Sequence, residues 1–219
     1  MDAILVIDVQ NDFLPGGALP VTNGDQVIPV INGIEHWFDL VLATQDWHPR
    51  NHGSFATIHP NRVPGDLVEL NGIPQVLWPV HCVQETFGAD FPAALSTEKF
   101  IKVFKKGTDP EIDSYSGFFD NGKKRSTGLA DYLRDRNVNR IFLCGLATDY
   151  CVKFSALDSV EAGFKTILIE DACRGVDLQP GDSTRAIEAM RRAGVTTIRS
   201  TDLESISQRD DNDASPCNR

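Results

Sequence analysis

The chain has 219 residues, of which 41% are hydrophobic and 24% charged, and its formal net charge is −10. This length suits one α/β domain with a sizeable core, and the hydrophobic content is that of an ordinary globular protein. The negative charge argues against nucleic acid or an anionic membrane surface as a partner, and no apolar run approaches transmembrane length.

The N-terminus and the cysteines indicate the cellular compartment. The segment from Met1 to Ile4 has neither a basic region nor a long apolar run, so we expect no signal peptide. The five cysteines are an odd number and lack the spacing of a disulfide framework. Both features predict a protein of the reducing cytoplasm.

The first predicted strand is the apolar run 3–7, which ends at Asp8. A carboxylate directly after a parallel strand sits at the carboxyl edge of the sheet, where open α/β folds bind ligands. Taken alone, Asp8 fits a loop or helix-capping role better than a catalytic one. A polar loop rich in Gly and Pro follows over 10–19, then an amphipathic helix over 27–37 and a second strand over 40–43.

Asp46 and His48 follow the second strand two residues apart, so their side chains point to the same side of an extended segment. No confident strand is predicted from there to residue 100, and so long an irregular region is typically a functional loop. It contains His81, which would complete a three-ligand metal site with open positions. Imidazole and carboxylate suit Zn²⁺, Fe²⁺ or Mn²⁺, and chance remains the simpler explanation of the pair by itself.

A third strand is predicted over 101–105 and leads to Lys106. A lysine at a strand end is most often solvated, so Lys106 alone carries no functional argument. Residues 113–119 form a loop with three aromatic side chains, which could line a pocket or simply pack within the loop. A helix is predicted over 129–136.

The most informative stretch is 141–152, where an apolar run of strand length breaks at Gly145 and leads into a helix over 151–162. With Thr148 or Asp149 as the N-cap, Cys151 falls in the first helical turn. Unpaired backbone N–H groups and the positive end of the helix dipole there favour a thiolate and could hold an oxyanion. The alternative of equal weight is a cysteine that only fills the core, as most free cysteines do.

The remaining elements complete an alternating pattern. A strand over 166–169 precedes a helix over 182–193, capped by Asp182 or Ser183, and a last strand covers 196–198. This alternation predicts a parallel sheet in a three-layer α/β fold. The domain is expected to span 1–205, and the polar residues 206–219 are expected to form a disordered tail.

The chemically active residues share one predicted location. Asp8, Asp46 with His48, Lys106 and Cys151 each follow one of four strands, and parallel strands end at the same edge of a sheet. Taken alone, none of these residues is better explained as catalytic than as structural. Four such groups at one edge predict an active site.

Five segments of the chain closely resemble the nicotinamidases, which are isochorismatase-like cysteine hydrolases. They are Ile7–Phe13, Gln45–Pro49, Trp78–Cys82, Phe104–Gly107 and Gly145–Cys151, in the order that the family has them. The resemblance spans residues 1–205. It implies a three-layer α-β-α sandwich around a six-stranded, mainly parallel sheet.

The resemblance also implies a reaction, the hydrolysis of nicotinamide to nicotinate and ammonia in NAD salvage, with pyrazinamide as a further substrate. It identifies Cys151 as the nucleophile, Asp8 as the acid/base and Lys106 as the third catalytic member. Lys106 rather than Lys105 matches, because the family lysine immediately precedes a glycine.

The same resemblance implies the binding residues. A cis peptide is expected between Leu146 and Ala147, so that the backbone N–H groups of Ala147 and Cys151 form the oxyanion hole. The implied ligands of one divalent ion (Zn, Fe or Mn) are Asp46, His48 and His81, with Ser54 in contact through water. The implied ring-binding residues are Phe13, Leu19, Trp78 and Tyr115.

Other functions are weighed against this one. A hydrolase of another small amide would leave the metal without a ring nitrogen to hold, and the isochorismatases themselves cleave an enol ether and need no cysteine. A non-enzymatic binding module would have no need of an intact Asp8, Lys106 and Cys151. The sequence leaves undecided whether the protein is a monomer or a homo-oligomer.

Overall fold

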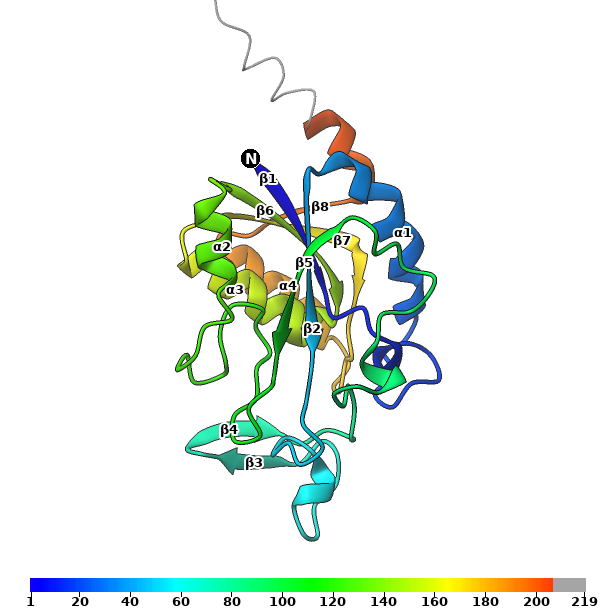
Figure 1. Cartoon of the computed structure of the whole chain (residues 1–219), viewed down its shortest axis with the longest axis vertical. Coiled ribbons are helices and arrows are strands. Elements are labelled where there is room, and N and C mark those ends of the chain that lie inside the picture. Colours follow the sequence, from blue (N-terminus) through cyan, green and yellow to red (C-terminus); the bar gives the residue numbers. More distant parts are fainter. Residues whose placement is uncertain (207–219) are drawn as a thin grey trace, which may run out of the picture.

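A six-stranded sheet forms the centre of the structure, a computed structural model that describes residues 1–206 (Figure 1). In spatial order the strands are β5 (Phe100–Lys106), β2 (Leu40–Asp46), β1 (Asp2–Ile7), β6 (Arg140–Leu146), β7 (Lys165–Arg174) and β8 (Thr196–Ile198). Every neighbouring pair is parallel, which confirms the predicted sheet. The predicted disordered tail lies outside the described residues, apart from Ile206.

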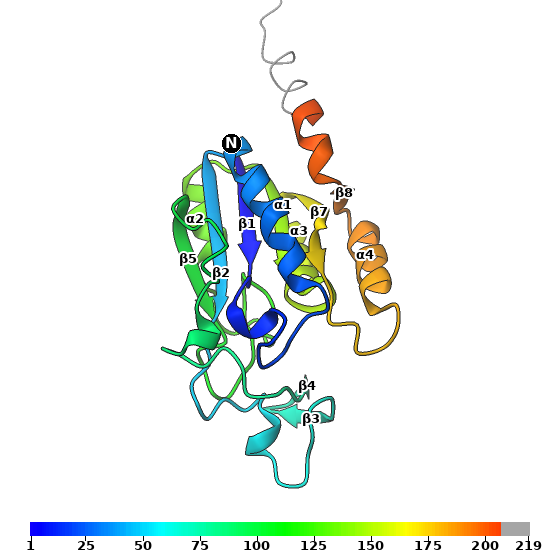
Figure 2. The same cartoon turned by 90° about the vertical axis from the view of Figure 1, so that its right-hand side faces the viewer.

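Helices cover both faces of the sheet and complete the predicted three layers. Figures 1 and 2 show α1 (Val27–Ile34) on one face. The other face carries α2 (Leu129–Asp135), α3 (Lys153–Glu161) and α4 (Asp182–Arg192). Right-handed crossovers explain this division. The connection from β1 to β2 runs toward one edge of the sheet, whereas those from β5 to β6, β6 to β7 and β7 to β8 run toward the other edge. Connections of the same hand that run in opposite directions lie on opposite faces.

The chain reverses its direction of winding between β1 and β6. These strands are neighbours, but β1 connects through α1 to β2, whereas β6 connects through α3 to β7 on the other side. Open α/β sheets bind their ligands at the carboxyl ends of two such strands. The topology therefore places Asp8, which follows β1, and Cys151, which follows β6, at the binding edge.

The two central strands are buried on both faces. Residues 3–7 of β1 and 141–144 of β6 are at most 1% exposed. Strands of this kind appear in a sequence as continuous apolar runs, which explains why both were predicted. The edge strand β5 is instead exposed at several positions, and these include the apolar Ile101.

A two-stranded antiparallel hairpin was not predicted. It consists of β3 (Leu67–Leu70) and β4 (Ile73–Val76) and lies beyond the carboxyl edge of the sheet, at the bottom of Figure 1. Its strands are short, partly exposed and interrupted by Pro74, so they lack a buried apolar run. The available signal was the turn Asn71-Gly72, which is typical of tight hairpins, and both residues have positive φ.

The helix predicted over 151–162 begins earlier and in a different form. A π-helical turn, η6 (Thr148–Val152), precedes α3. The N-cap is Ala147 and no side chain caps the turn, so the predicted capping role of Thr148 or Asp149 is wrong. The N-cap of α4 is Gly181, and Asp182 is already the first helical residue. The predicted capping role of Asp182 or Ser183 is therefore wrong as well.

Within residues 1–206, no helix combines the length and the apolar character that a membrane span requires.

Candidate active site

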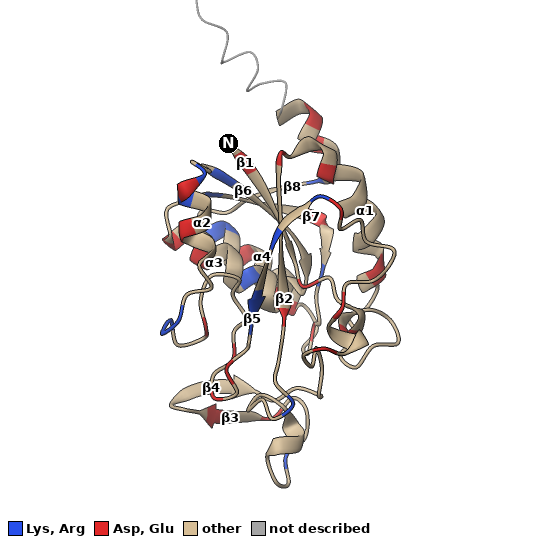
Figure 3. Cartoon of the chain, viewed as in Figure 1, with Lys and Arg blue, Asp and Glu red and all other residues tan. Residues whose placement is uncertain are grey.

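The charged residues that end β5 and β2 meet at the carboxyl edge, where Figure 3 shows the blue end of β5 beside the red end of β2. They are Lys106 and Asp46, which are direct partners in the register of the two strands. Asp8 follows β1, and Cys151 lies in η6 directly after β6. The structure therefore brings together the four strand ends at which the sequence predicts an active site.

The Lys106 ammonium group is the centre of this cluster. Its Nζ atom lies 2.9 Å from Asp8 Oδ2 and 2.6 Å from Asp46 Oδ1. Nζ also lies 3.4 Å from Cys151 Sγ and donates a 2.9 Å hydrogen bond to the Ser114 carbonyl oxygen. Because a buried cation is stable only with such partners, Lys106 fixes the carboxylates and the thiol relative to one another.

Asp8 is held from two sides and lies close to the thiol. Its Oδ1 accepts a 2.7 Å hydrogen bond from Thr44 Oγ1, while Oδ2 faces Lys106. One of its carboxylate oxygens lies within 4.8 Å of Cys151 Sγ. Catalytic hydrogen bonds often tighten only in the reacting complex, so this geometry suits proton transfer between the two groups.

The two carboxylates have opposite electrostatic environments. Burial raises the pKa of Asp8 above its ordinary value, and the charge of Lys106 offsets this only in part. Burial acts on Asp46 as well, but there Lys106 and His48 prevail and hold the pKa well below its usual range. Carboxyl groups whose pKa values are pushed apart suit different tasks. Asp8 is suited to exchange a proton, whereas Asp46 is suited to remain an ionised ligand.

The surroundings of Cys151 oppose the thiolate that the sequence predicts. Its side chain is buried, and burial raises the pKa of the thiol well above the ordinary value. Lys106 lowers this pKa, but Asp8 and Asp46 raise it. Burial and the two carboxylates therefore oppose the thiolate that the helix terminus would favour. A buried thiol needs a base to become a nucleophile, and Asp8 is the adjacent one.

Gly145 allows the turn that carries Cys151 to approach β1. Its φ is +116°, and a Cβ atom at this position would lie 2.1 Å from the carbonyl oxygen of Ile7. Only glycine tolerates this approach. One residue further along, the peptide bond Leu146-Ala147 is cis, as the resemblance implies. Ala147 and Cys151 both line the pocket described below, and the role of their N–H groups as an oxyanion hole stays a prediction.

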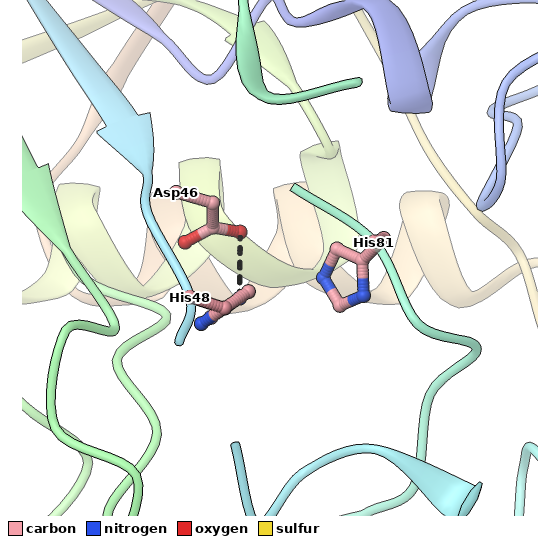
Figure 4. A group of neighbouring side chains, drawn as sticks. All are labelled: Asp46, His48 and His81. Carbon is pink, nitrogen blue, oxygen red and sulfur yellow. Dashed lines mark ion pairs between the residues drawn. The ribbon is translucent and has the colours of Figure 1, made fainter. Parts of the chain in front are cut away.

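Asp46, His48 and His81 form a buried group that fits a divalent metal ion (Figure 4). Their ligand atoms lie within 4.8 Å of one another, with His48 Nε2 3.7 Å from Asp46 Oδ2. His48 Nδ1 lies 2.8 Å from the Gly107 carbonyl oxygen, and His81 Nδ1 lies 2.8 Å from that of Pro79. Such hydrogen bonds place the proton on Nδ1 and leave Nε2 free for a metal.

His52 and Ser54 lie beside this group. Both are fully buried, and Ser54 Oγ lies 2.7 Å from His52 Nδ1. The His52 ring packs against His48 with 4.2 Å between the ring centroids, and its Nε2 atom has no hydrogen-bond partner within residues 1–206. Contact of Ser54 with an ion through water stays a prediction. His52 is a neighbour of the site that the sequence analysis did not assign.

An aromatic pocket opens beside Cys151 and the three candidate ligands. Its walls include all four predicted ring-binding residues, namely Phe13, Leu19, Trp78 and Tyr115. The hydroxyl oxygen of Tyr115 accepts hydrogen bonds from Trp78 Nε1 at 3.1 Å and from Gln75 Nε2 at 3.0 Å. These bonds fix the orientation of the wall, and an apolar pocket with a few oriented polar groups suits a small planar ligand.

Three further residues line the pocket: Asp113, which lies in the loop 113–119 that the sequence offers as a possible wall, and Tyr150 and Val176, which were not predicted. The position of Tyr150 next to Cys151 was the one signal available for it. Asp113 accepts a 2.8 Å hydrogen bond from Gln75 Nε2, so the unpredicted hairpin positions its carboxylate. Val176 comes from the loop after β7, and no sequence pattern points to it.

The fold and the site together define the class of protein. The isochorismatase domain matches residues 2–202, and the chain belongs to this family. Two relatives within the family, 47% and 43% identical over 92% of this chain, are nicotinamidases. The nicotinamidase of Escherichia coli K12 is 47% identical over 208 residues, which cover 92% of this chain and 96% of that protein.

Solved structures agree with this assignment. A nicotinamidase and pyrazinamidase of Acinetobacter baumanii is 46% identical and superimposes with a TM-score of 0.90, over 92% of this chain and 97% of the other. A pyrazinamidase of Pyrococcus horikoshii in complex with zinc is 39% identical with a TM-score of 0.73, over 90% of this chain and 98% of the other.

Proposed function

We propose that this protein hydrolyses nicotinamide to nicotinate and ammonia through a thioester on Cys151, with pyrazinamide as a second substrate. One observation carries the proposal: Cys151, Asp8 and Lys106 meet at the wall of an aromatic pocket, beside a group of three metal-ligand side chains. The nicotinamidase relative that is 47% identical over nearly all of both chains supports the same activity. The predicted cytoplasmic location is part of this proposal.

The pocket would hold the pyridine ring between its aromatic walls, with the carboxamide directed toward Cys151. A divalent ion held by Asp46, His48 and His81 would supply an open coordination position to the ring nitrogen and so orient the ring. The zinc complex of the Pyrococcus horikoshii relative supports zinc as the ion. Iron and manganese suit the same ligands.

The first half of the reaction forms the thioester. Asp8 takes the proton from Cys151 Sγ as the sulfur forms a bond to the carboxamide carbon, and the carbonyl electron pair moves onto oxygen. The backbone N–H groups of Ala147 and Cys151 stabilise that oxyanion. Asp8 then gives its proton to the amide nitrogen, the C–N bond breaks and ammonia leaves.

The second half releases nicotinate. Asp8 takes a proton from a water molecule whose oxygen forms a bond to the thioester carbon. The tetrahedral intermediate collapses, the C–S bond breaks, and the proton held by Asp8 returns to Cys151. Throughout, the ammonium of Lys106 offsets the negative charge that passes between Asp8 and Cys151 and keeps both groups in place.

Ammonia release from nicotinamide, measured for the unchanged protein and for Cys151→Ala, tests the proposal. We expect turnover that the substitution abolishes. Ammonia from other small amides but not from nicotinamide would indicate a related amide hydrolase. Absence of turnover on every amide would indicate a catalytically inactive binding module.

A further inference from the structure

The loop between β7 and α4 contributes an aliphatic wall to the pocket through Val176. The family resemblance already implies the other apolar walls, such as Trp78 and Tyr115, as ring-binding residues. Val176 lies in no motif, yet its half-buried side chain borders the same space. Its position therefore bears on which rings the pocket accepts.

A buried carboxylate holds this loop. Asp149 is 6% exposed, and its Oδ1 accepts a 2.9 Å hydrogen bond from the backbone N–H of Val176. Its Oδ2 accepts a 2.8 Å hydrogen bond from the backbone N–H of Asp177. Hydrogen bonds to an ionised acceptor are stronger than those between neutral groups. The Asp149 side chain thus holds this loop, and it does not cap the helix as the sequence predicts.

The other side of the loop is equally constrained. The Asp177 carboxylate accepts hydrogen bonds from the backbone N–H and the Oγ of Ser183 in α4, at 2.8 and 2.7 Å. A Cβ atom at Gly175 would lie 1.8 Å from Ser183 Oγ and 3.2 Å from Asp149 Oδ1. The segment 175–177 is therefore held between η6 and α4, which fixes the backbone that carries Val176.

We propose that Val176 is a specificity-determining residue, which limits the substituents that the ring of the bound amide can carry. Asp149 is the positioning residue that holds Val176 at the pocket. This inference rests on the proposed hydrolysis of an aromatic amide in this pocket. Asp149 lies two residues before Cys151 in the same η6 turn. One short segment thus carries the nucleophile and also fixes the pocket wall that lies 25 or more residues further along the chain.

The substrate preference tests the role of Val176. We would measure kcat/KM of Val176→Ala and Val176→Ile for nicotinamide and its four ring-methylated isomers. One methyl group in an apolar pocket is worth roughly 10-fold or more in discrimination. For at least one methylated amide, we expect kcat/KM relative to that for nicotinamide to rise by about that factor in Val176→Ala and to fall in Val176→Ile. Leu178→Ala, an exposed change in the same loop, is the matched control.

A double-mutant cycle tests the role of Asp149. Asp149→Ala should favour the same methylated amide as Val176→Ala. In the Val176→Ala background it should not change the substrate preference further, because Asp149 acts through the Val176 side chain. The ratio between two substrates of one variant cancels any common loss of kcat, so damage to the η6 turn does not mimic the effect. Asp149→Asn, which retains one acceptor oxygen, replaces Asp149→Ala if that variant does not fold.

The outcomes separate the two proposals. Failure of the unchanged protein to hydrolyse nicotinamide would overturn both. Normal turnover with an unaltered preference in Val176→Ala and Val176→Ile would overturn only the specificity role. Additive preference shifts for Asp149 and Val176, or an Asp149 variant that slows all five amides equally, would overturn the positioning role.

Discussion

At the level of single residues, the surroundings of Asp8 and Asp46 divide the chemistry between two otherwise identical side chains. Both are buried and both contact Lys106. Asp46 has two imidazole neighbours as well, whereas Asp8 has the Thr44 hydroxyl and the thiol. The position of each carboxylate relative to positive charge therefore decides which one can exchange a proton.

Asp8→Asn should keep the fold and lower kcat by roughly 10²-fold or more, the usual effect of losing a general acid/base. The amide can still accept the hydrogen bond from Thr44 but cannot take the proton of Cys151. Steady-state ammonia release measures the loss. Asp25→Asn, at an exposed carboxylate, is the control, and near-normal turnover in Asp8→Asn would remove Asp8 from the mechanism.

Benzamide separates ring orientation from chemistry, because it keeps the carboxamide and the ring shape but lacks the pyridine nitrogen. If an ion on Asp46, His48 and His81 holds that nitrogen, kcat/KM for benzamide should be lower than for nicotinamide by on the order of 10² or more. Chelation should weaken nicotinamide turnover and leave alkylation of Cys151 by iodoacetamide largely intact. Equal efficiency on both amides would show that the ion does not bind the ring.

At the level of elements, the end of β6 is the critical junction. β6 must stop against β1 so that η6 can bring Cys151 to the carboxylates, and Gly145 is the residue at which this happens. The β3–β4 hairpin has a comparable role, since Gln75 holds both Asp113 and Tyr115 at the pocket. Two short segments therefore carry much of the geometry of the site.

Gly145→Ala should reduce the free energy of unfolding by at least about 2 kcal/mol, because a Cβ atom would overlap the Ile7 carbonyl and the φ of +116° disfavours any side chain. Urea unfolding measures the change. Gly33→Ala is the matched control, since Gly33 lies exposed in α1 with open space around it. That change should instead stabilise the protein by about 0.5–1 kcal/mol. Equal effects of the two substitutions would contradict the close-approach argument.

At the level of the whole molecule, the sheet separates a reactive carboxyl edge from a structural amino edge. Glu35 lies just before β2, near the amino edge, and is 3% exposed. Its Oε1 has no hydrogen-bond partner in the described part of the chain. Burial raises the pKa of Glu35 from 4.5 to about 7, with Lys99 lowering it and Glu98 raising it.

Glu35→Gln should make stability less dependent on pH. The folded state binds the Glu35 proton more tightly than the unfolded state, so this group stabilises the fold below pH 4.5 and loses that contribution as the pH rises through about 7. Between pH 5 and pH 8 the free energy of unfolding of the unchanged protein should therefore fall by on the order of 1 kcal/mol more than that of Glu35→Gln. Urea unfolding at both pH values checks this, with exposed Glu111→Gln as the control. A parallel pH dependence of the two proteins would contradict it.

The sequence by itself determined the sheet and most of the candidate site. Buried parallel strands are continuous apolar runs, so β1 and β6 could be recognised without any knowledge of their neighbours. Residues that directly follow such strands must share one edge, and this rule brought Asp8, Lys106 and Cys151 together before their distances were known. A local sequence pattern is therefore sufficient to locate functional residues that directly follow a strand.

Only the tertiary structure decided the remaining features, because they depend on contacts between distant segments and on burial. Gln75 and Asp113 meet through a hairpin whose strands carry no buried run, and Val176 reaches the pocket through the hold of Asp149 on its loop. The groups that oppose a Cys151 thiolate are a further example. A helix terminus can be read from the sequence, but the burial of a thiol and the two carboxylates beside it arise only when the chain is folded.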